Sequence, residues 1–234
     1  MELAASAPVE PVFLPRSTRW IVGVDLGQSI DPTAVAVMEH IKGVLDYNSS
    51  WERHTGTGTI PQKPAERMNV RYLERLPLGL SYPAVVDHVK RLLATPPLCG
   101  DGKLKPADLI IDQTGVGAAV GDLFEAGGMK PIRVSITVGS EVTYAKRAWH
   151  VAKTALISTV DARLHSGVLR FAAALRDAPA LRDELLDFRR HLSDAGRATY
   201  AARAGKHDDL VLAVAIAAWW ASRRPGTPPA MGTW

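Results

Sequence analysis

The 234-residue sequence has little of what marks several common classes of protein. A single cysteine, Cys99, excludes an internal disulfide bond and a cysteine-based zinc site. The longest apolar run, residues 210–221, is too short to cross a bilayer. Residues 1–15 hold several prolines and lack the basic start of a signal peptide. These absences predict a cytoplasmic globular protein without a membrane partner.

A GxxxxGK[ST] phosphate loop is also missing from the sequence. We therefore do not expect this chain to hydrolyse ATP by itself. Its length is enough for one large domain with a buried core. The proline-containing ends predict a flexible segment at residues 1–18 and an irregular tail at residues 223–234, on either side of one domain at residues 19–222.

Positive charge is present in excess and is unevenly placed. The net charge is +4, and residues 163–206 alone hold nine Arg or Lys against five acids. A basic tract that leads to an acid pair suits a polyanion held near metal-binding carboxylates, although a solvated helix face would look the same. The nucleic-acid-binding candidates are Arg197, Arg203, Lys206 and His207.

Hydrophobic periodicity predicts an α/β domain with a mixed sheet flanked by helices. The five predicted strands lie at residues 20–25, 33–37, 68–76, 109–112 and 131–138. The first three are joined by links too short for a crossover and should be antiparallel, whereas the last two enclose a helix and should be parallel. Helices are predicted at residues 82–93, 115–126, 149–165, 179–191 and 211 to about 222.

Four aspartates stand at the ends of these elements. Asp25 and Asp112 each end an apolar run, and Asp208 and Asp209 head the last helix. Taken singly, such residues are usually turn formers or helix caps. If the strands of Asp25 and Asp112 are neighbours, however, both side chains reach one sheet edge, and the helix can bring its acids over them. The set therefore predicts a shared site.

Carboxylate oxygens are hard ligands that suit Mg2+ or Mn2+ rather than zinc. Two such ions roughly 4 Å apart can activate a water molecule and stabilise the leaving oxygen of a phosphodiester. The spacing of the acids permits this two-metal chemistry without requiring it.

Several motifs occur in a recognisable order. They are GVDLG at residues 23–27 with DPTA at 31–34, LERLPLG at 73–79, IDQTGVG at 111–117 and KHDDLVLA at 206–213. Together they resemble the nuclease domain of phage terminase large subunits, over about residues 20–220. The resemblance implies a ribonuclease H-like fold and an endonuclease that cuts concatemeric viral DNA during packaging, in the cytoplasm of the infected host. It also implies that Asp25, Asp112, Asp208 and Asp209 are catalytic and hold two Mg2+ or Mn2+ ions.

The resemblance further implies which partners the chain has. These are double-stranded DNA, a packaging ATPase domain or subunit, the small terminase subunit and the portal. Large terminases begin with that ATPase, so the missing phosphate loop puts motor activity on another domain or polypeptide. In ribonuclease H-like enzymes the helix acid is followed by one residue and then Leu, which implies that Asp208 is the closer metal ligand. Asp209 would then support that ligand, bind the second ion or be a first-turn acid favoured by the helix dipole.

Other functions remain open at this point. A Holliday-junction resolvase would use the same acids on a junction-shaped substrate. The DLGQS sequence at residues 25–29 also resembles the first phosphate loop of sugar kinases and actin-like ATPases, which need a duplicated fold. A catalytically silent DNA-binding module is a third alternative. Gly115 and Gly117 suit either a phosphate cradle or, as we prefer, a tight strand-to-helix turn.

Overall fold

The computed structural model describes residues 10–27, 31–48, 50–57, 62–193 and 207–223. Its eight strands are β1 (Val12–Asp25), β2 (Ala34–Asp46), β3 (Lys63–Arg75), β4 (Asp108–Asp112), β5 (Ile132–Thr137), β6 (Val142–Ala145), β7 (Ala148–Ala152) and β8 (Leu169–Phe171). Its six helices are α1 (Ser50–Thr55), α2 (Tyr82–Leu93), α3 (Ala118–Ala126), α4 (Lys153–His165), α5 (Ala178–Ser193) and α6 (Asp209–Ser222). No helix in these ranges is long and apolar enough to cross a membrane.

All strands belong to one sheet in the order β6-β7-β5-β4-β1-β2-β3-β8. The first three strands are antiparallel, and β4 and β5 run parallel to β1, which confirms the predicted five-stranded arrangement. Three strands extend it beyond the prediction: β7 pairs in parallel with β5, β6 forms a hairpin with β7, and β8 pairs with β3. The sheet is therefore mixed, with β7 and β6 added at one edge and β8 at the other.

Several predicted boundaries are wrong. Strand β2 continues to Asp46, β3 begins already at Lys63, and the helix expected from residue 115 begins at Ala118. Residues 149–152 were expected in a helix but form most of β7, because Trp149 and Val151 are buried while the backbone pairs with β5 on one side and β6 on the other. A short apolar run buried on both faces gives no periodicity that separates strand from helix. Residues 12–18 were expected in the flexible segment but belong to β1, which pairs with β2 from Val12 onward.

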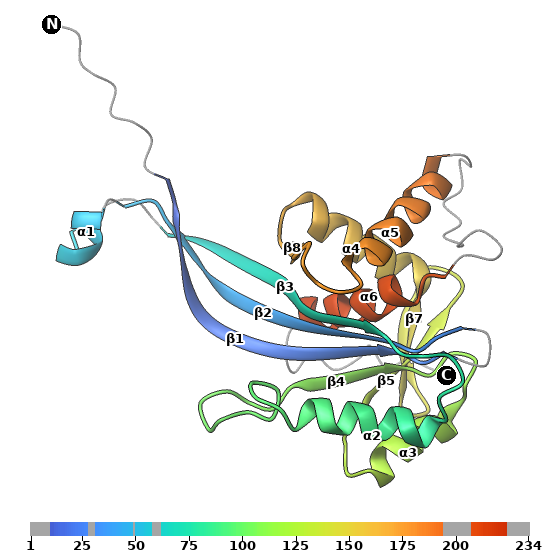
Figure 1. Ribbon diagram of the computed structural model, residues 1–234. Coiled ribbons are helices and arrows are strands. Elements are labelled where there is room, and N and C mark those ends of the chain that lie inside the picture. Colours follow the sequence, from blue (N-terminus) through green and yellow to red (C-terminus); the bar gives the residue numbers. More distant parts are fainter. Residues whose placement is uncertain (1–9, 28–30, 49, 58–61, 194–206, 224–234) are drawn as a thin grey trace, which may run out of the picture.

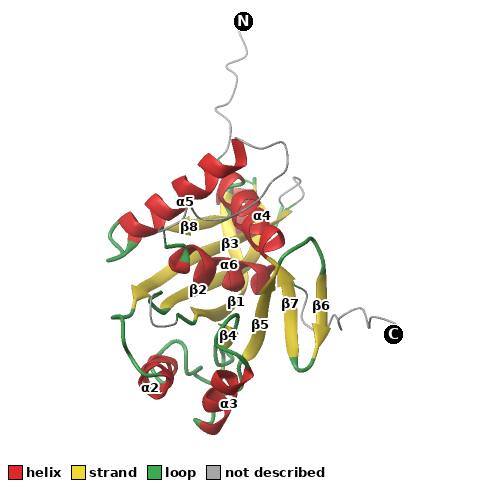
Figure 2. Cartoon of the chain, turned by 90° about the vertical axis from the view of Figure 1, so that its right-hand side faces the viewer, coloured by secondary structure: helices red, strands yellow, loops and turns green. Residues whose placement is uncertain are grey.

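Helices cover both faces of the sheet (Figure 2). On one face α2 and α3 pack on Val22, Val24 and Val35. On the other face α4, α5 and α6 pack on the alternate residues of the same strands, such as Ile21 and Met38. The long strands β1, β2 and β3 extend beyond the helices as an arm that carries α1 near its end (Figure 1).

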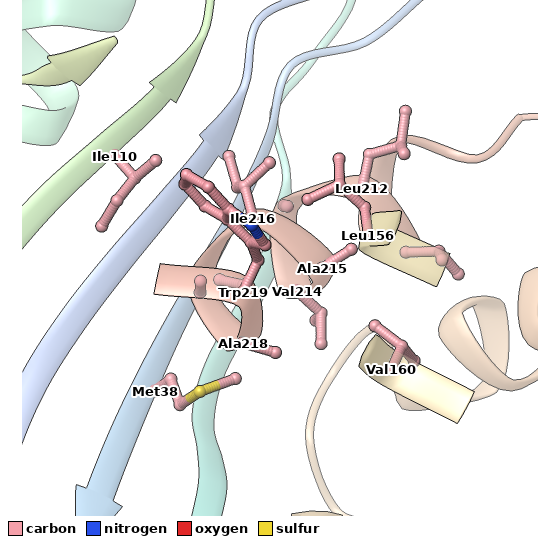
Figure 3. Packing of buried hydrophobic residues seen from close by; sticks show 14 of the residues in the cluster. Met38, Ile110, Leu156, Val160, Leu212, Val214, Ala215, Ile216, Ala218 and Trp219 are labelled. Carbon is pink, nitrogen blue, oxygen red and sulfur yellow. The ribbon is translucent and has the colours of Figure 1, made fainter. Parts of the chain in front are cut away.

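Helix α6 is the centre of the larger core. Twelve of its 14 residues are buried, so it is apolar on every side and lies between the sheet and α4 (Figure 3). It packs closely on β1 at Gly23, where a Cβ atom would lie 2.2 Å from the Ala213 carbonyl oxygen. Glycine at this position therefore lets the helix, with its leading acids, lie directly against the strand that ends in Asp25.

Candidate active site

The carboxyl ends of β1 and β4 bring two of the predicted aspartates together. The strands are parallel neighbours, and their pairing sets Asp25 beside Asp112. Asp112 is only 4% exposed, and its side chain shares a hydrogen bond with Asp25. Two carboxyl groups this close need a shared proton or a cation between them, because two adjacent negative charges repel strongly when buried.

The loop after β4 holds Asp112 in position. Thr114 donates to Asp112 Oδ1 from its backbone N–H at 2.9 Å and from its hydroxyl at 2.6 Å. Its hydroxyl oxygen also accepts the backbone N–H of Ile136 at 2.6 Å, which ties the loop to β5. Gly115 and Gly117 have φ values of 77° and 79°. This left-handed backbone favours glycine and agrees with the predicted strand-to-helix turn.

Helix α6 begins over this pair of aspartates. Asp208 immediately precedes the helix and is half-buried, whereas Asp209 is its first residue and is buried. Their charges, with that of Asp112, raise the pKa of Asp25, so all four predicted acids lie in one electrostatic environment. The helix N-terminus itself favours negative charge at this position.

Burial is the first cause of the raised pKa of Asp25, which lies well above its ordinary value. Lys153 opposes the shift but does not cancel it. Burial raises the pKa of Asp112 as well, against the opposing effect of the Thr114 hydrogen bonds. Carboxyl groups whose pKa is raised by burial are typical of sites that bind a proton or a cation.

Two cations that we did not predict flank the helix acids. The Lys153 ammonium pairs with Asp208, and Arg75 Nε donates to Asp209 Oδ2 at 2.7 Å. Both residues stand at the carboxyl ends of strands, since Arg75 ends β3 and Lys153 directly follows β7. A charged residue at a strand end was the same signal that identified the acids. The signal was available for Arg75, near the end of the strand predicted at residues 68–76, but for Lys153 it could be used only once β7 was known to be a strand.

Glu184 of α5 completes this network and was also missed. It pairs with Arg75 and accepts the backbone N–H of Val211 at 2.9 Å, which satisfies one of the free donors in the first turn of α6. Burial raises the pKa of Glu184 to about 8, with a further contribution from Asp209, although Arg75 lowers it. Arg75 therefore joins α5 to the start of α6 and fixes Asp209.

The donor set can be tested for its fit to a metal ion. Among the residues that the structure describes, no three acidic, histidine or cysteine side chains are arranged as a metal site. Asp208 instead pairs with Lys153 and Asp209 with Arg75. Asp25 and Asp112 still offer hard oxygen ligands side by side, next to the charge of Asp208. This chemistry fits Mg2+ or Mn2+.

Of the predicted nucleic-acid contacts, only His207 can be placed. It is exposed, and its Nδ1 lies 3.6 Å from Asp31 Oδ1 and 3.9 Å from Asp209 Oδ1, at the rim of the acidic site. Arg197, Arg203 and Lys206 lie outside the described residues. The residues of the tail beyond 223 lie outside them too.

The sheet order and the helices on both faces define a ribonuclease H-like fold. A solved structure with this fold is the large terminase nuclease from thermophilic phage G20c. The two chains are 19% identical with a TM-score of 0.51, and the match covers 86% of this chain and 81% of that one. At this identity the likeness establishes the fold that the motifs predicted. No protein-family model matches the chain, and no curated protein matches its sequence.

Proposed function

We propose that the protein is a metal-dependent DNA endonuclease that cuts concatemeric viral DNA during genome packaging. The observation that carries this proposal is the convergence of Asp25, Asp112, Asp208 and Asp209, from three separate motifs, at one edge of the sheet. The fold likeness to a phage terminase nuclease supports the same function. On this view the chain acts in the cytoplasm of an infected bacterial host.

The residues have distinct roles in this proposal. Asp25 and Asp112 would hold Mg2+ or Mn2+ together with Asp208, while Asp209 is fixed by Arg75 and supports the helix start. Two ions in such a site supply an activated water molecule and charge stabilisation at the leaving oxygen. Thr114 keeps Asp112 pointed at the site. Lys153 neutralises Asp208 in the metal-free site, and its ammonium group could bind a DNA phosphate if a cation took its place at Asp208.

The DNA itself is held by positive charge around the acids. Arg197, Arg203 and Lys206 precede the acid pair in the sequence, and His207 lies exposed beside it. Contacts from such groups to backbone phosphates carry little sequence information, so cutting should be largely independent of sequence. Motor activity is assigned to a packaging ATPase domain or subunit. The small terminase subunit and the portal are further proposed partners.

The direct test is incubation of the purified protein with supercoiled plasmid, in Mn2+ and in excess EDTA. We expect nicked and linear DNA in Mn2+ only. Asp87→Asn is a matched control, because Asp87 is an exposed aspartate of α2, on the face of the sheet opposite α6. It should cut like the wild type, whereas Asp25→Asn should not. Cutting that survives in EDTA or in Asp25→Asn would refute the proposal, and a strong preference for four-way junctions would favour a resolvase.

A further inference from the structure

A basic pocket lies at the end of the sheet opposite the acids. It has a volume of about 300 Å3 and is lined by five basic side chains, Arg19, His40, Lys42, Lys103 and Lys105. Ser17 and Thr18 complete the lining, which includes no acidic residue. Thr18 and Asp25 are seven residues apart on β1, which corresponds to roughly 23 Å in a strand. The pocket, which we call the distal basic pocket, is therefore separate from the acidic site.

The fold builds this pocket from three segments. Strand pairing sets Ser17 beside Lys42 and Arg19 beside His40, so these side chains share one face of the sheet. A bulge between Pro15 and Ser17 shifts the register at the pocket edge. The loop between α2 and β4, which runs beside β1 in Figure 1, brings in Lys103 and Lys105.

The loop that carries these two lysines is itself held in shape. Asp101 Oδ1 accepts the backbone N–H groups of Lys103 and Leu104 at 3.0 and 2.8 Å. The Leu104 carbonyl oxygen in turn accepts the Asp101 N–H. The two lysines therefore extend from an ordered turn. This order reduces the conformational entropy that the loop would lose when a ligand binds.

Two acids near the pocket pair with Arg19 and His40 of its lining and, among the described residues, leave the lysines without a carboxylate partner. Asp108 Oδ2 lies 3.3 Å from Arg19 Nε and accepts the indole N–H of Trp220. Glu66 lies between His40, at 2.9 Å, and Arg163. Within the described part of the chain, no carboxylate forms an ion pair with the side chains of Lys42, Lys103 or Lys105.

The positive charge of the three pocket lysines is consequently not compensated by a carboxylate of the described residues, whereas Arg19 and His40 each have an acidic partner. Burial lowers the pKa of the Arg19 guanidinium, although Asp108 opposes this shift. The charged form of Arg19 is therefore less stable in the pocket than in water. An anion would relieve that penalty. Lysine ammonium groups are compact point charges, and three of them around one pocket suit the charged oxygens of a phosphate group.

We propose that the distal basic pocket binds a phosphate group. The phosphate could be carried by a nucleic-acid backbone or by a small molecule, and the chemistry of recognition is the same. A backbone phosphate bound there would belong to DNA outside the segment held at the acids. The inference depends on the lining of the pocket and holds whether or not the protein cuts DNA.

The test measures binding by the full chain in excess EDTA, where no divalent ion can act at the aspartates. One arm follows a short fluorescein-labelled DNA duplex by anisotropy at several salt concentrations, and the other follows inorganic pyrophosphate by calorimetry. The pocket variant is Lys42→Gln, Lys103→Gln and Lys105→Gln combined. The control variant is Lys90→Gln, Arg91→Gln and Lys130→Gln, which removes the same charge from exposed positions elsewhere. Circular dichroism checks that both variants fold.

The pocket variant should lose affinity for at least one probe by about fivefold or more relative to the control variant. Loss for the duplex, with a salt slope reduced by about one unit per lost contact, identifies a backbone phosphate. Loss for pyrophosphate alone identifies a small phosphate ligand. The proposal is overturned if neither probe binds the wild type, or if the pocket and control variants bind both probes equally well.

Discussion

The two ends of helix α6 lie in opposite charge environments. Its N-terminus carries Asp208 and Asp209 and faces Asp25 and Asp112. At its C-terminus Arg19 donates to the Trp220 carbonyl oxygen at 3.1 Å. Both arrangements agree with the helix dipole, which favours anions at the first turn and cations at the last.

The difference between the two ends lies in how far each charge is compensated. At the basic end, Asp108 and Glu66 are paired with arginine or histidine. At the acidic end, the cations Lys153 and Arg75 face a larger number of carboxyl groups, and the pKa values of Asp25, Asp112 and Glu184 are all raised. A buried excess of negative charge is costly for stability, which is why we interpret this end as the functional one.

The largest effect is expected when a strand aspartate is neutralised. Asp25→Asn or Asp112→Asn should reduce plasmid cleavage at least ~1000-fold, because each change removes a ligand charge. Stability in EDTA should not fall, since the raised pKa values mean that the native site disfavours these charges. Thermal unfolding and cleavage rates measured on the same preparations check both parts. Loss of cleavage together with loss of folding would point to a structural role instead.

The two helix acids should differ from each other. Asp208→Asn should abolish cleavage and weaken Mn2+ binding about 10- to 100-fold, whereas Asp209→Asn should be milder, because Arg75 would retain Glu184 as a partner. Calorimetric Mn2+ titration of both variants decides this. An active Asp208→Asn variant beside an inactive Asp209→Asn variant would reverse the assignment.

Close packing of α6 on β1 can be broken at Gly23. Gly23→Ala should lower the free energy of unfolding by about 2–3 kcal/mol, since the new methyl group meets the Ala213 carbonyl oxygen. Gly128→Ala is a useful comparison: its φ of 84° is unfavourable for alanine, but the added Cβ atom meets no other atom within 4 Å. Chemical denaturation of both variants gives the two values. Equal losses would mean that the close approach at Gly23 is unimportant.

The smallest effect concerns pH. The pKa of Glu184 is about 8 in the folded protein, above the ordinary carboxyl value, so its contribution to stability is complete below about pH 4.5 and is lost as the pH rises through 8. In EDTA, the free energy of unfolding should fall by ~1–3 kcal/mol less in Glu184→Gln than in the wild type as the pH rises from about 4.5 through 8. Denaturation at several pH values measures the difference. An unchanged pH profile in the variant would show that Glu184 titrates normally.

The sequence predicted much of the site because its signals were local. Asp25 and Asp112 end apolar runs, and the acid pair precedes an apolar helix, so each was visible without knowledge of the fold. Helix α2 was predicted with its bounds and with Ser81 as its N-cap, whose side chain accepts the Ala84 N–H.

The residues that were missed depend on tertiary contacts. Lys153 joins the site because β7 ends at Ala152, and residues 149–152 read as helix from sequence alone. Glu184 lies on a helix where acids are usually exposed, and it is buried only because Arg75 and the Val211 N–H meet it. The periodicity of a sequence describes single helices and strands, and it does not predict a contact between segments that are far apart in the chain.

The most direct test of the account is to locate manganese in the protein. Crystals soaked in Mn2+ and measured at the manganese absorption edge should show anomalous density between Asp25 and Asp112, in contact with Asp208. Lys153 should then have moved away from Asp208. Manganese bound only elsewhere, or an empty position between the two strand aspartates at concentrations that support cleavage, would contradict the assignment of these residues as the metal-binding site.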